Sequence, residues 1–323
     1  MQLRSLVLFA PPLIVLAAYP FVAEQGYLTY VLLLIIAYSI VGLYYNLLLG
    51  YLGIPFLGPM IPFAVGGYTT GYLTTIHYDP FVGIIVGSIF AAGSGFAFSL
   101  PSMRLRGLYM ALYSLVFTLF FQQLISRDDV PALFHIFVGA IGQNAVPDIH
   151  LGGFAWRLND GLAYYYLTLG LLVGSAIFLK ILLNSRFGIA FKGVRDAEVY
   201  ASTLGIGIFR VKIIAFAISS FFIGLAGAVL TLFYGAIGVT ILDTSNMLLF
   251  FSMVVFGGLG TFLGPIAGAF VLVPLDNYLT HFGAWRLLAW GAAVLFVVLI
   301  APEGVVGRLQ RFVKGRSIRK PTG

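Results

Sequence analysis

The sequence predicts an all-helical polytopic membrane protein, and its composition, its long apolar runs and its clustered basic residues each support this fold class. Of the 323 residues, 60% are hydrophobic and only 9% are charged. A soluble domain carries about 25% charged residues, because water must wet its surface. No polar linker separates the apolar runs, so we expect one membrane domain over residues 1–305 and a basic tail over 306–323.

About eight apolar runs are long enough to cross a bilayer, since a crossing needs about 20 largely apolar residues. They cover 6–22, 28–48, about 60–76, 81–100, 107–125, 162–183, 211–234 and 283–300. The first run follows Arg4 and resembles a signal peptide. However, Pro11, Pro12 and the bulky residues 19–21 replace the small residues of a cleavage site. We therefore expect an uncleaved first span.

Basic clusters beside these runs predict how the chain is oriented. Of the 18 Lys and Arg residues, 15 lie at Arg4, at Arg104 and Arg106, over 180–212 and over 308–320. Lys and Arg beside spans mark the cytoplasmic side. Both termini and loop 185–210 are then cytoplasmic, and segment 126–161 is external. Nucleic-acid binding needs a folded basic surface, so a basic tail directly after a span indicates orientation instead.

The stretch 247–275 is apolar but interrupted. Its 29 residues are too few for two crossings, and the orientation places both of its ends on the external side. We expect a re-entrant helical hairpin around Gly257, Gly258 and Gly260. Irregular backbone at membrane depth must be buried in protein or line a wet cavity, which makes this hairpin a pathway candidate.

A second interrupted segment covers 50–68. Its three prolines, at 55, 59 and 62, would disrupt a helix, and its glycines permit close helix approach. Interrupted segments early and late in a chain suggest a weak internal two-fold repeat around a central route. The pathway candidates here are Gly58, Gly66, Gly67 and Tyr68. The alternative is that the glycines only pack helices.

Polar residues are few inside the predicted spans. Ser114, Thr118 and Gln122 share one helix face at four-residue spacing. They are pathway candidates, although hydrogen bonding between helices explains them better. The predicted spans contain no acidic residue, and Lys180 lies near a span end, where it can snorkel. A proton-coupled carrier needs a titratable group in the membrane, so we do not expect one.

The sequence lacks the motifs of ATP binding, metal binding and enzymatic catalysis. No P-loop sequence occurs, so an ATPase would be another polypeptide. The four histidines fall in predicted external segments without metal-ligand spacing, and the chain has no cysteine. No catalytic pair shares a predicted helix face. We therefore expect no cofactor, no metal site and no enzymatic activity.

The basic segment 184–212 mixes apolar and charged residues at roughly helical spacing. Asp196 suits the opening of a helix, whose N-terminus is positive. We expect Gly205 to end that helix and a second short helix to begin toward Lys212. Two short helices at an angle would form a knob that docks into another protein. The alternative is a connector lying on the membrane surface.

Short sequence words along the chain carry a family resemblance. They are Leu105–Leu112 (LRGLYMAL), Ser185–Ala190 (SRFGIA), Arg195–Glu198 (RDAE), Leu204–Ile206 (LGI), Lys212–Phe216 (KIIAF), Gly224–Ala228 (GLAGA), Val255–Thr261 (VFGGLGT), Gly264–Pro265 and Ala301–Gly304 (APEG). Together they cover about residues 40 to 305. The chain resembles the permeases of branched-chain amino acid ABC importers, specifically the LivM-like subunits; urea and short-amide permeases are close relatives.

The resemblance implies a heteromeric importer in the inner membrane. A second, similar permease would complete the heterodimer, two ATPase subunits would bind beneath, and a periplasmic binding protein would deliver the substrate. Segment 185–210 would be the ATPase-coupling loop, through Arg186, Gly188, Arg195, Asp196, Glu198, Ala201 and Gly205. The general signature Glu-Ala-Ala before a glycine is only partly kept, because Val199-Tyr200-Ala201 precedes Gly205 and the acid stands at Glu198.

The resemblance thus predicts a permease that forms half of a route for branched-chain or related amino acids. At the early interrupted segment the family's Ser-Leu-Gly-His is replaced by Phe56-Leu57-Gly58-Pro59. This departure leaves a urea or short-amide ABC permease as an alternative. A standalone channel or facilitator for a small neutral solute is a further alternative. A membrane-bound enzyme is disfavoured, because catalytic pairs are missing.

Overall fold

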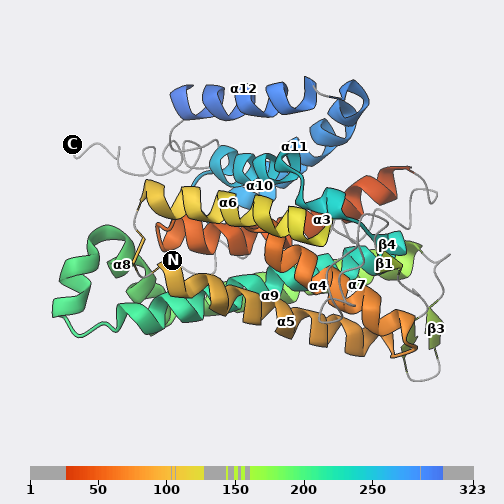
Figure 1. The fold of residues 1–323 in the computed structure, drawn as a ribbon, viewed down its shortest axis with the longest axis horizontal. Coiled ribbons are helices and arrows are strands. Elements are labelled where there is room, and N and C mark those ends of the chain that lie inside the picture. Colours follow the sequence, from red (N-terminus) through yellow and green to blue (C-terminus); the bar gives the residue numbers. More distant parts are fainter. Residues whose placement is uncertain are drawn as a thin grey trace, which may run out of the picture.

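The computed structural model describes residues 27–102, 104–105, 107–126, 143–144, 149–151, 154–156, 161–283 and 285–300. Most of these residues are helical, and the long helices run side by side along the long axis of the molecule (Figure 1). The helices are α3 (Tyr27–Asn46), α4 (Met60–Thr75), α5 (Pro80–Ser102), α6 (Leu108–Ile125), α7 (Gly161–Asn184), α8 (Arg186–Thr203), α9 (Ile208–Tyr234), α10 (Thr244–Gly257), α11 (Gly264–Leu279) and α12 (Trp285–Ile300). The all-helical prediction is confirmed.

Five helical segments are long and apolar enough to cross a membrane within the described residues. They are Tyr27–Tyr51, Pro80–Pro101, Leu108–Ile125, Leu162–Asn184 and Ile208–Tyr234. Each coincides with a predicted span. Helices α4 and α12 have only 16 residues each over the described part of the chain, and the first predicted run, 6–22, lies outside it. The count of eight full spans therefore stays a prediction.

Helix α3 lies at the centre of the bundle. Within Tyr27–Tyr51, which is α3 and its continuation, 89% of the most apolar 18 residues are buried, compared with 22% in α6. It packs against α7, α9, α10 and α11. Its sequence is apolar on every side, which is typical of a helix enclosed by other helices. Its Tyr44 hydroxyl donates a hydrogen bond to the Ser175 carbonyl of α7 at 2.8 Å.

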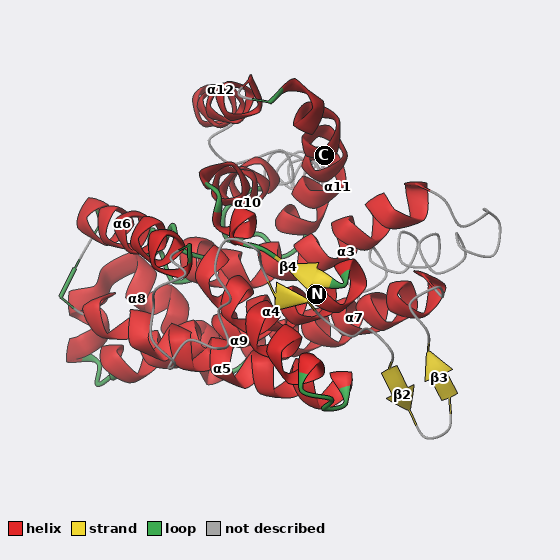
Figure 2. Ribbon diagram, turned by 45° about the vertical axis from the view of Figure 1, so that its right-hand side comes forward, coloured by secondary structure: helices red, strands yellow, loops and turns green. Residues whose placement is uncertain are grey.

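Short strands and the helix α8 mark opposite ends of the molecule (Figure 1). Strand β1 (Gln143–Asn144) pairs antiparallel with β4 (Ala236–Ile237), directly after α9. Strands β2 (Ile149–Leu151) and β3 (Phe154–Trp156) form a separate hairpin that extends beyond the helices (Figure 2). The remainder of the predicted external segment 126–161 lies largely outside the described residues.

Helices α10 and α11 form the predicted pair of short helices. They pack antiparallel, since Gly257 lies against Gly264 and Met253 lies against Gly268. At about 1.5 Å per residue, the 14 residues of α10 extend about 21 Å, less than the roughly 30 Å of a bilayer core. That the pair is re-entrant stays a prediction.

Helices α4, α5 and α9 pack closely through glycines. A Cβ atom on Gly66 of α4 would lie 2.2 Å from the Gly224 carbonyl oxygen of α9. A Cβ atom on Gly87 of α5 would lie 2.6 Å from the Gly66 carbonyl oxygen. Backbone atoms fill the space on both sides, so no side chain fits. Small residues of this kind let membrane helices approach each other closely, as predicted for this segment.

Gly66→Ala is therefore expected to destabilise the protein by about 1–3 kcal/mol, the usual cost of overpacking a filled interior. Thermal unfolding of the detergent-solubilised protein would measure the change. Gly174→Ala in α7 is a matched control, because a Cβ atom there meets nothing within 4 Å. Equal midpoints for the two variants would contradict the close packing of α4 on α9.

Candidate functional site

The early interruption is shorter than predicted. Helix α3 continues into a π-helix, η1 (Leu47–Tyr51), and residues 53–58 have no regular secondary structure. Helix α4 then begins at Met60 and runs unbroken through Gly66, Gly67 and Tyr68. The expectation of an interruption over all of 50–68 is corrected: Pro59 is the N-cap of α4 and Pro62 lies in its first turn, where a missing N–H costs little.

Residues 54–58 are buried or half-buried in the protein, whereas Gly53 is exposed. Phe56 is 1% exposed and makes edge-to-face contacts with Phe98 of α5 and Phe216 of α9. The Leu57 N–H donates to the Ser114 hydroxyl oxygen of α6 at 2.8 Å. Backbone without regular structure is tolerated at membrane depth when it is buried in protein and its polar groups are satisfied. This segment meets both conditions at Phe56 and Leu57.

The polar face of α6 packs against this segment. Ser114 and Thr118 are buried, and a Cβ atom on Gly58 would lie 3.2 Å from the Thr118 hydroxyl. One turn farther along α6, Gln122 Nε2 donates to Asp243 Oδ1 at 2.8 Å. Hydrogen bonding between segments, the favoured explanation of this face, is thus present at Ser114 and Gln122. A role in lining the pathway stays a prediction.

Helix α8 projects at the end of the molecule opposite the strands (Figure 1). Ser185 caps its N-terminus by accepting a hydrogen bond from the Phe187 N–H. Its C-terminus closes as a Schellman motif, in which Gly205 has φ +81° and the Ile206 N–H donates to the Ala201 carbonyl at 3.1 Å. The prediction that Gly205 ends a helix is confirmed.

The angle within this segment lies elsewhere than predicted. Ala197 has non-helical torsions (φ −158°, ψ 84°), so α8 is two short helical arms on either side of it. The helix that follows Gly205 is not a second short arm but α9, which begins at Ile208. The predicted second short helix after Gly205 is therefore corrected. Asp196 lies just before the bend at Ala197, close to the N-terminus of the second arm, where a carboxylate is favourable.

The arms of α8 are held by buried residues and one ion pair. Gly188 and Ala201 are buried, and a Cβ atom on Gly188 would lie 2.0 Å from the Leu183 carbonyl oxygen. Glu198 pairs with Lys212 of α9 at 2.9 Å, and the Lys212 side chain is only 5% exposed. Arg186, Arg195, Asp196 and Gly205 are exposed. The predicted coupling residues therefore form two sets. Gly188, Glu198 and Ala201 fix α8 to the rest of the protein, and the remaining ones lie on its exposed surface.

The outer surface of α8 is partly apolar. Four large apolar side chains are strongly exposed on it or on the turn after it: Ile189 (71%), Val199 (63%), Tyr200 (74%) and Leu204 (81%). They lie on both arms and at the C-terminal turn. Exposed apolar residues that cluster on one projecting element mark an interaction surface. We call these four residues the α8 apolar surface.

The two interrupted segments of the chain meet beside α8. Asn46, the last residue of α3, accepts a hydrogen bond from the Gly260 N–H at 2.9 Å and donates one to the Thr261 carbonyl at 2.8 Å. Four residues later, the Gly50 carbonyl accepts a hydrogen bond from Arg195 Nη1 at 3.0 Å. We call these contacts the Asn46–Arg195 junction.

A pocket of about 170 Å³ opens next to this junction. It lies between α8, segment 52–55 and the start of α6, and Arg195, Glu198 and Lys212 contribute to its wall. The ion pair between Glu198 and Lys212 satisfies these two charges within the protein. Within the described part of the chain, no group of three His, Asp or Glu residues could hold a metal ion.

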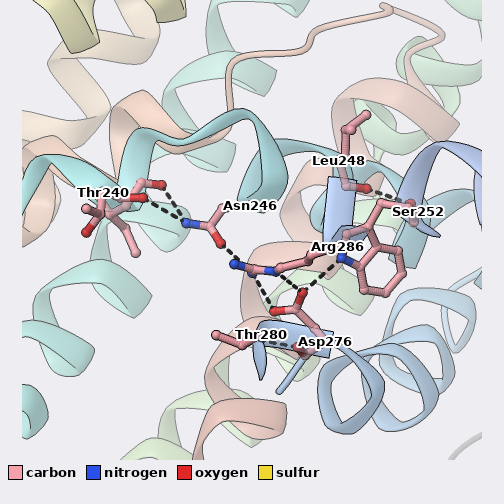
Figure 3. Close-up of polar contacts among 9 residues, drawn as sticks. Thr240, Asn246, Leu248, Ser252, Asp276, Thr280 and Arg286 are labelled. Carbon is pink, nitrogen blue, oxygen red and sulfur yellow. Dashed lines mark hydrogen bonds and ion pairs between the residues drawn. The ribbon is translucent and has the colours of Figure 1, made fainter. Parts of the chain in front are cut away.

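A buried polar cluster lies at the opposite end of the hairpin from the Gly258–Leu263 turn (Figure 3). Asp276 of α11 binds Arg286 of α12 through both carboxylate oxygens, each at 2.7 Å. It also accepts a hydrogen bond from the Trp290 indole at 2.9 Å. Asn246 of α10 accepts from Arg286 at 3.1 Å. The cluster therefore ties α10, α11 and α12 together.

Asn46 stands out in the sequence as one of the few polar residues within the predicted spans, but neither its partners nor the Asp276 cluster was predicted. Arg286 lies inside the predicted last span, and Asp276 lies ten residues before it. A charged residue inside an apolar span usually has a partner and a role, so the pair could have been found by this signal. Asn46 was a polar residue in an apolar run, but nothing nearby in sequence identified its partners at 260 and 261.

Comparisons with known proteins give one family. The model of the family described as "Branched-chain amino acid transport system / permease component" matches residues 27–302. The high-affinity branched-chain amino acid transport system permease protein LivM of Escherichia coli (strain K12) is 28% identical over 317 residues, which is 93% of this chain and 74% of the relative. No solved structure gives a significant match.

Two other permease proteins match about half of the chain. The high-affinity branched-chain amino acid transport system permease protein LivH of Salmonella typhimurium (strain LT2) is 26% identical over 172 residues, covering 51% of this chain and 56% of the relative. The xylose transport system permease protein XylH of Escherichia coli (strain K12) is 27% identical over 168 residues, covering 49% of this chain and 42% of the relative.

Proposed function

Because the chain belongs to the family of permease components of branched-chain amino acid transport systems, we propose that it forms half of the membrane route of an ATP-driven importer for branched-chain or related amino acids. It is a transport subunit and not an enzyme. The five membrane-length apolar helices supply the membrane body that this function requires. The sequence contains no P-loop, so ATP would be hydrolysed on a partner chain.

The partners follow from the same family. The chain is similar both to a LivM and to a LivH, two permease proteins of branched-chain amino acid transport systems. We infer that a second, similar permease subunit completes the route as a heterodimer. Two ATPase subunits would bind on the cytoplasmic side, and a substrate-binding protein would deliver the amino acid on the other side.

The α8 apolar surface is the observation that carries this proposal. A connector that lies on a membrane is a continuous amphipathic helix with one apolar face. Helix α8 is instead bent at Ala197, and its exposed apolar residues lie on both arms. The Schellman turn and the ion pair between Glu198 and Lys212 fix the second arm against α9. This arrangement suits docking into a cleft of an ATPase.

Orientation is part of the proposal. The segment from Lys180 to Lys212 carries six Lys or Arg residues, and basic residues near spans stay in the cytoplasm. We propose that α8 faces the cytoplasm, that the strands face the exterior, and that both termini are cytoplasmic. The membrane domain would then be residues 1–305, with 185–210 as its coupling loop and 306–323 as a basic tail.

Truncating the α8 apolar surface is expected to release the ATPase. The double variant Tyr200→Ala with Leu204→Ala should lower the amount of ATPase that co-purifies with the complex at least about tenfold, because truncated anchor residues at an interface often cost about 2 kcal/mol or more. Uptake of labelled leucine should fall in parallel. Unchanged co-purification would contradict docking through α8.

The matched control removes two exposed apolar side chains elsewhere. Leu112 and Val116 of α6 are 50% and 61% exposed and lie on a candidate span. Leu112→Ala with Val116→Ala should leave ATPase binding unchanged.

A separate uptake experiment addresses the substrate. Competition of leucine uptake by valine, urea and short amides would assign the substrate class. Uptake by the purified chain alone without ATP would instead favour a facilitator.

A further inference from the structure

The Asn46–Arg195 junction joins three parts of the chain that are far apart in sequence: α8, the end of α3 and the turn between α10 and α11. We propose that Arg195 and Asn46 are positioning residues that transmit displacement of α8 to the α10–α11 hairpin. This inference rests on the proposed function, since it assigns the route by which a docked ATPase would move the membrane helices.

The first link is between the hairpin turn and α3. Asn46 is 1% exposed, and its side-chain amide uses its oxygen for the Gly260 N–H and its nitrogen for the Thr261 carbonyl. Gly258 and Gly260 have φ of 110° and 70°, so the turn is not helical and needs partners outside the two helices. Leaving a buried polar group unpaired is costly, so the turn is held in one position against Asn46.

The second link is between α3 and α8. The π-helix at the end of α3 leaves backbone carbonyls without partners inside the helix. The Gly50 carbonyl is one that is satisfied from outside, by Arg195 Nη1. Arg195 Nε is in turn held by Asp196 at 2.9 Å, on the same helix. The guanidinium group therefore moves with α8, at the boundary between its two arms.

Glycines make room for both links. A Cβ atom on Gly50 would lie 2.1 Å from Asn46 Oδ1 and 2.3 Å from the Gly260 nitrogen. A Cβ atom on Gly53 would lie 2.6 Å from Arg195 Cγ, and Gly53 has φ +72°. The side chain of Arg195 thus passes closely over one glycine to reach the carbonyl of another.

One turn of backbone at the end of α3 connects the two links. Asn46 and Gly50 are about one helical turn apart, so a shift of the Gly50 carbonyl displaces the residue that holds the hairpin turn. A movement of α8 would therefore reach the hairpin through two side chains and one turn of backbone. The Arg195 side chain is 41% exposed and donates a charge-assisted hydrogen bond, whereas Asn46 is buried and bonds through both its oxygen and its nitrogen. Charge-assisted and networked hydrogen bonds are stronger than isolated neutral ones, which suits transmission of a displacement.

The test measures substrate transported per ATP hydrolysed by the complete importer in proteoliposomes. Arg195→Ala and Asn46→Ala should each lower this ratio at least about threefold, while ATPase binding and ATP hydrolysis persist. Because both residues act in one chain of contacts, the double variant should lose no more than the more severe single variant. Arg195→Lys, which keeps a donor and the charge, should restore part of the ratio.

Two further variants separate transmission from folding. Gly53→Ala removes no polar group; its Cβ atom displaces the Arg195 side chain, and the alanine also strains the backbone at φ +72°. It should therefore lower the ratio even if Asn46→Ala fails to fold, provided that the amount of folded protein is measured alongside. Lys192→Ala, at an exposed basic residue three positions before Arg195 on α8, should keep the wild-type ratio.

The outcomes distinguish this inference from the proposed function. If Arg195→Ala and Gly53→Ala both keep the wild-type ratio of substrate transported per ATP hydrolysed, the junction does not transmit the displacement. The same conclusion holds if uptake falls only as much as the amount of folded protein falls, while the ratio is unchanged. A wild-type chain that binds no ATPase and shows no ATP-dependent uptake refutes the proposed function itself.

Discussion

Asp276→Ala is expected to destabilise the folded protein by about 3–5 kcal/mol, because removing one partner of a buried ion pair leaves the other charge without compensation. The Asp276 and Arg286 side chains are only 12% and 20% exposed. The variant also leaves the Trp290 indole without its acceptor, and Trp290 is fully buried. Unfolding in a mixed detergent titration, followed by tryptophan fluorescence, would give the free energy.

A paired substitution supplies the control. Replacing both members of a buried ion pair by apolar residues of similar size is often neutral or stabilising. Asp276→Leu combined with Arg286→Met should therefore recover the part of the stability that Asp276→Ala loses through the uncompensated Arg286 charge, although the Trp290 indole still lacks its acceptor. A loss below about 1 kcal/mol in the single variant would mean that water reaches the cluster and that these charges behave like an exposed pair.

The cluster is one of two polar attachments of the α10–α11 hairpin. Asp276, Arg286 and Asn246 join α11, α12 and α10 at the end of the hairpin away from its turn (Figure 3). The Asn46–Arg195 junction holds the turn itself. The hairpin is thus fixed at both ends by buried polar contacts, and only one of the two attachments leads to α8.

The long helices could be predicted from the sequence because their signal is local. An apolar run of about 20 residues has few alternatives to a membrane helix, and α5 (Pro80–Ser102) differs from its predicted run by only two residues at its C-terminal end and one at its N-terminal end. Gly205 was also predictable, because a glycine after a polar helix favours the left-handed C-terminal position.

The bend in α8 had no local signal. Alanine is the best helix former, yet Ala197 has non-helical torsions. On either side of it, Arg195 contacts Gly50 and Glu198 contacts Lys212, so residues far away in sequence hold the chain at both ends of the bend. Tertiary contacts therefore override the intrinsic preference. The extent of the early interruption was overestimated for a related reason: Pro59 and Pro62 count as helix breakers in the interior of a helix but suit its first turn.

The candidate site was predictable as a set of segments but not as a set of contacts. Glycines at 50, 53 and 260 mark interrupted backbone in the sequence. That Asn46 joins these interruptions depends on the meeting of residues more than 200 positions apart. Periodicity carries no information on such pairs. For the same reason the sequence left two explanations open for Ser114, Thr118 and Gln122.

Gly257→Val is expected to abolish uptake and to destabilise the protein by about 3 kcal/mol, at the upper end of the cost of overpacking. A Cβ atom at this position would lie 2.0 Å from the Gly264 carbonyl oxygen and 2.2 Å from its carbon. Both are backbone atoms, so no side chain can move aside. The turn cannot absorb the displacement either, because Asn46 holds Gly260 and Thr261. Gly291→Val in α12 is the matched control, since a Cβ atom there meets nothing within 4 Å.

Measuring both unfolding and uptake separates the two explanations for the hairpin glycines, which are helix packing and lining of the substrate pathway. If Gly257 only packs α10 against α11, the milder Gly257→Ala should lower the unfolding midpoint and the uptake together. If the backbone at Gly257 also lines the route of the substrate, uptake by Gly257→Ala should fall further than the amount of folded protein. Wild-type stability and wild-type uptake in Gly257→Val would contradict both explanations, because the α10–α11 contact leaves no space for a side chain at that position.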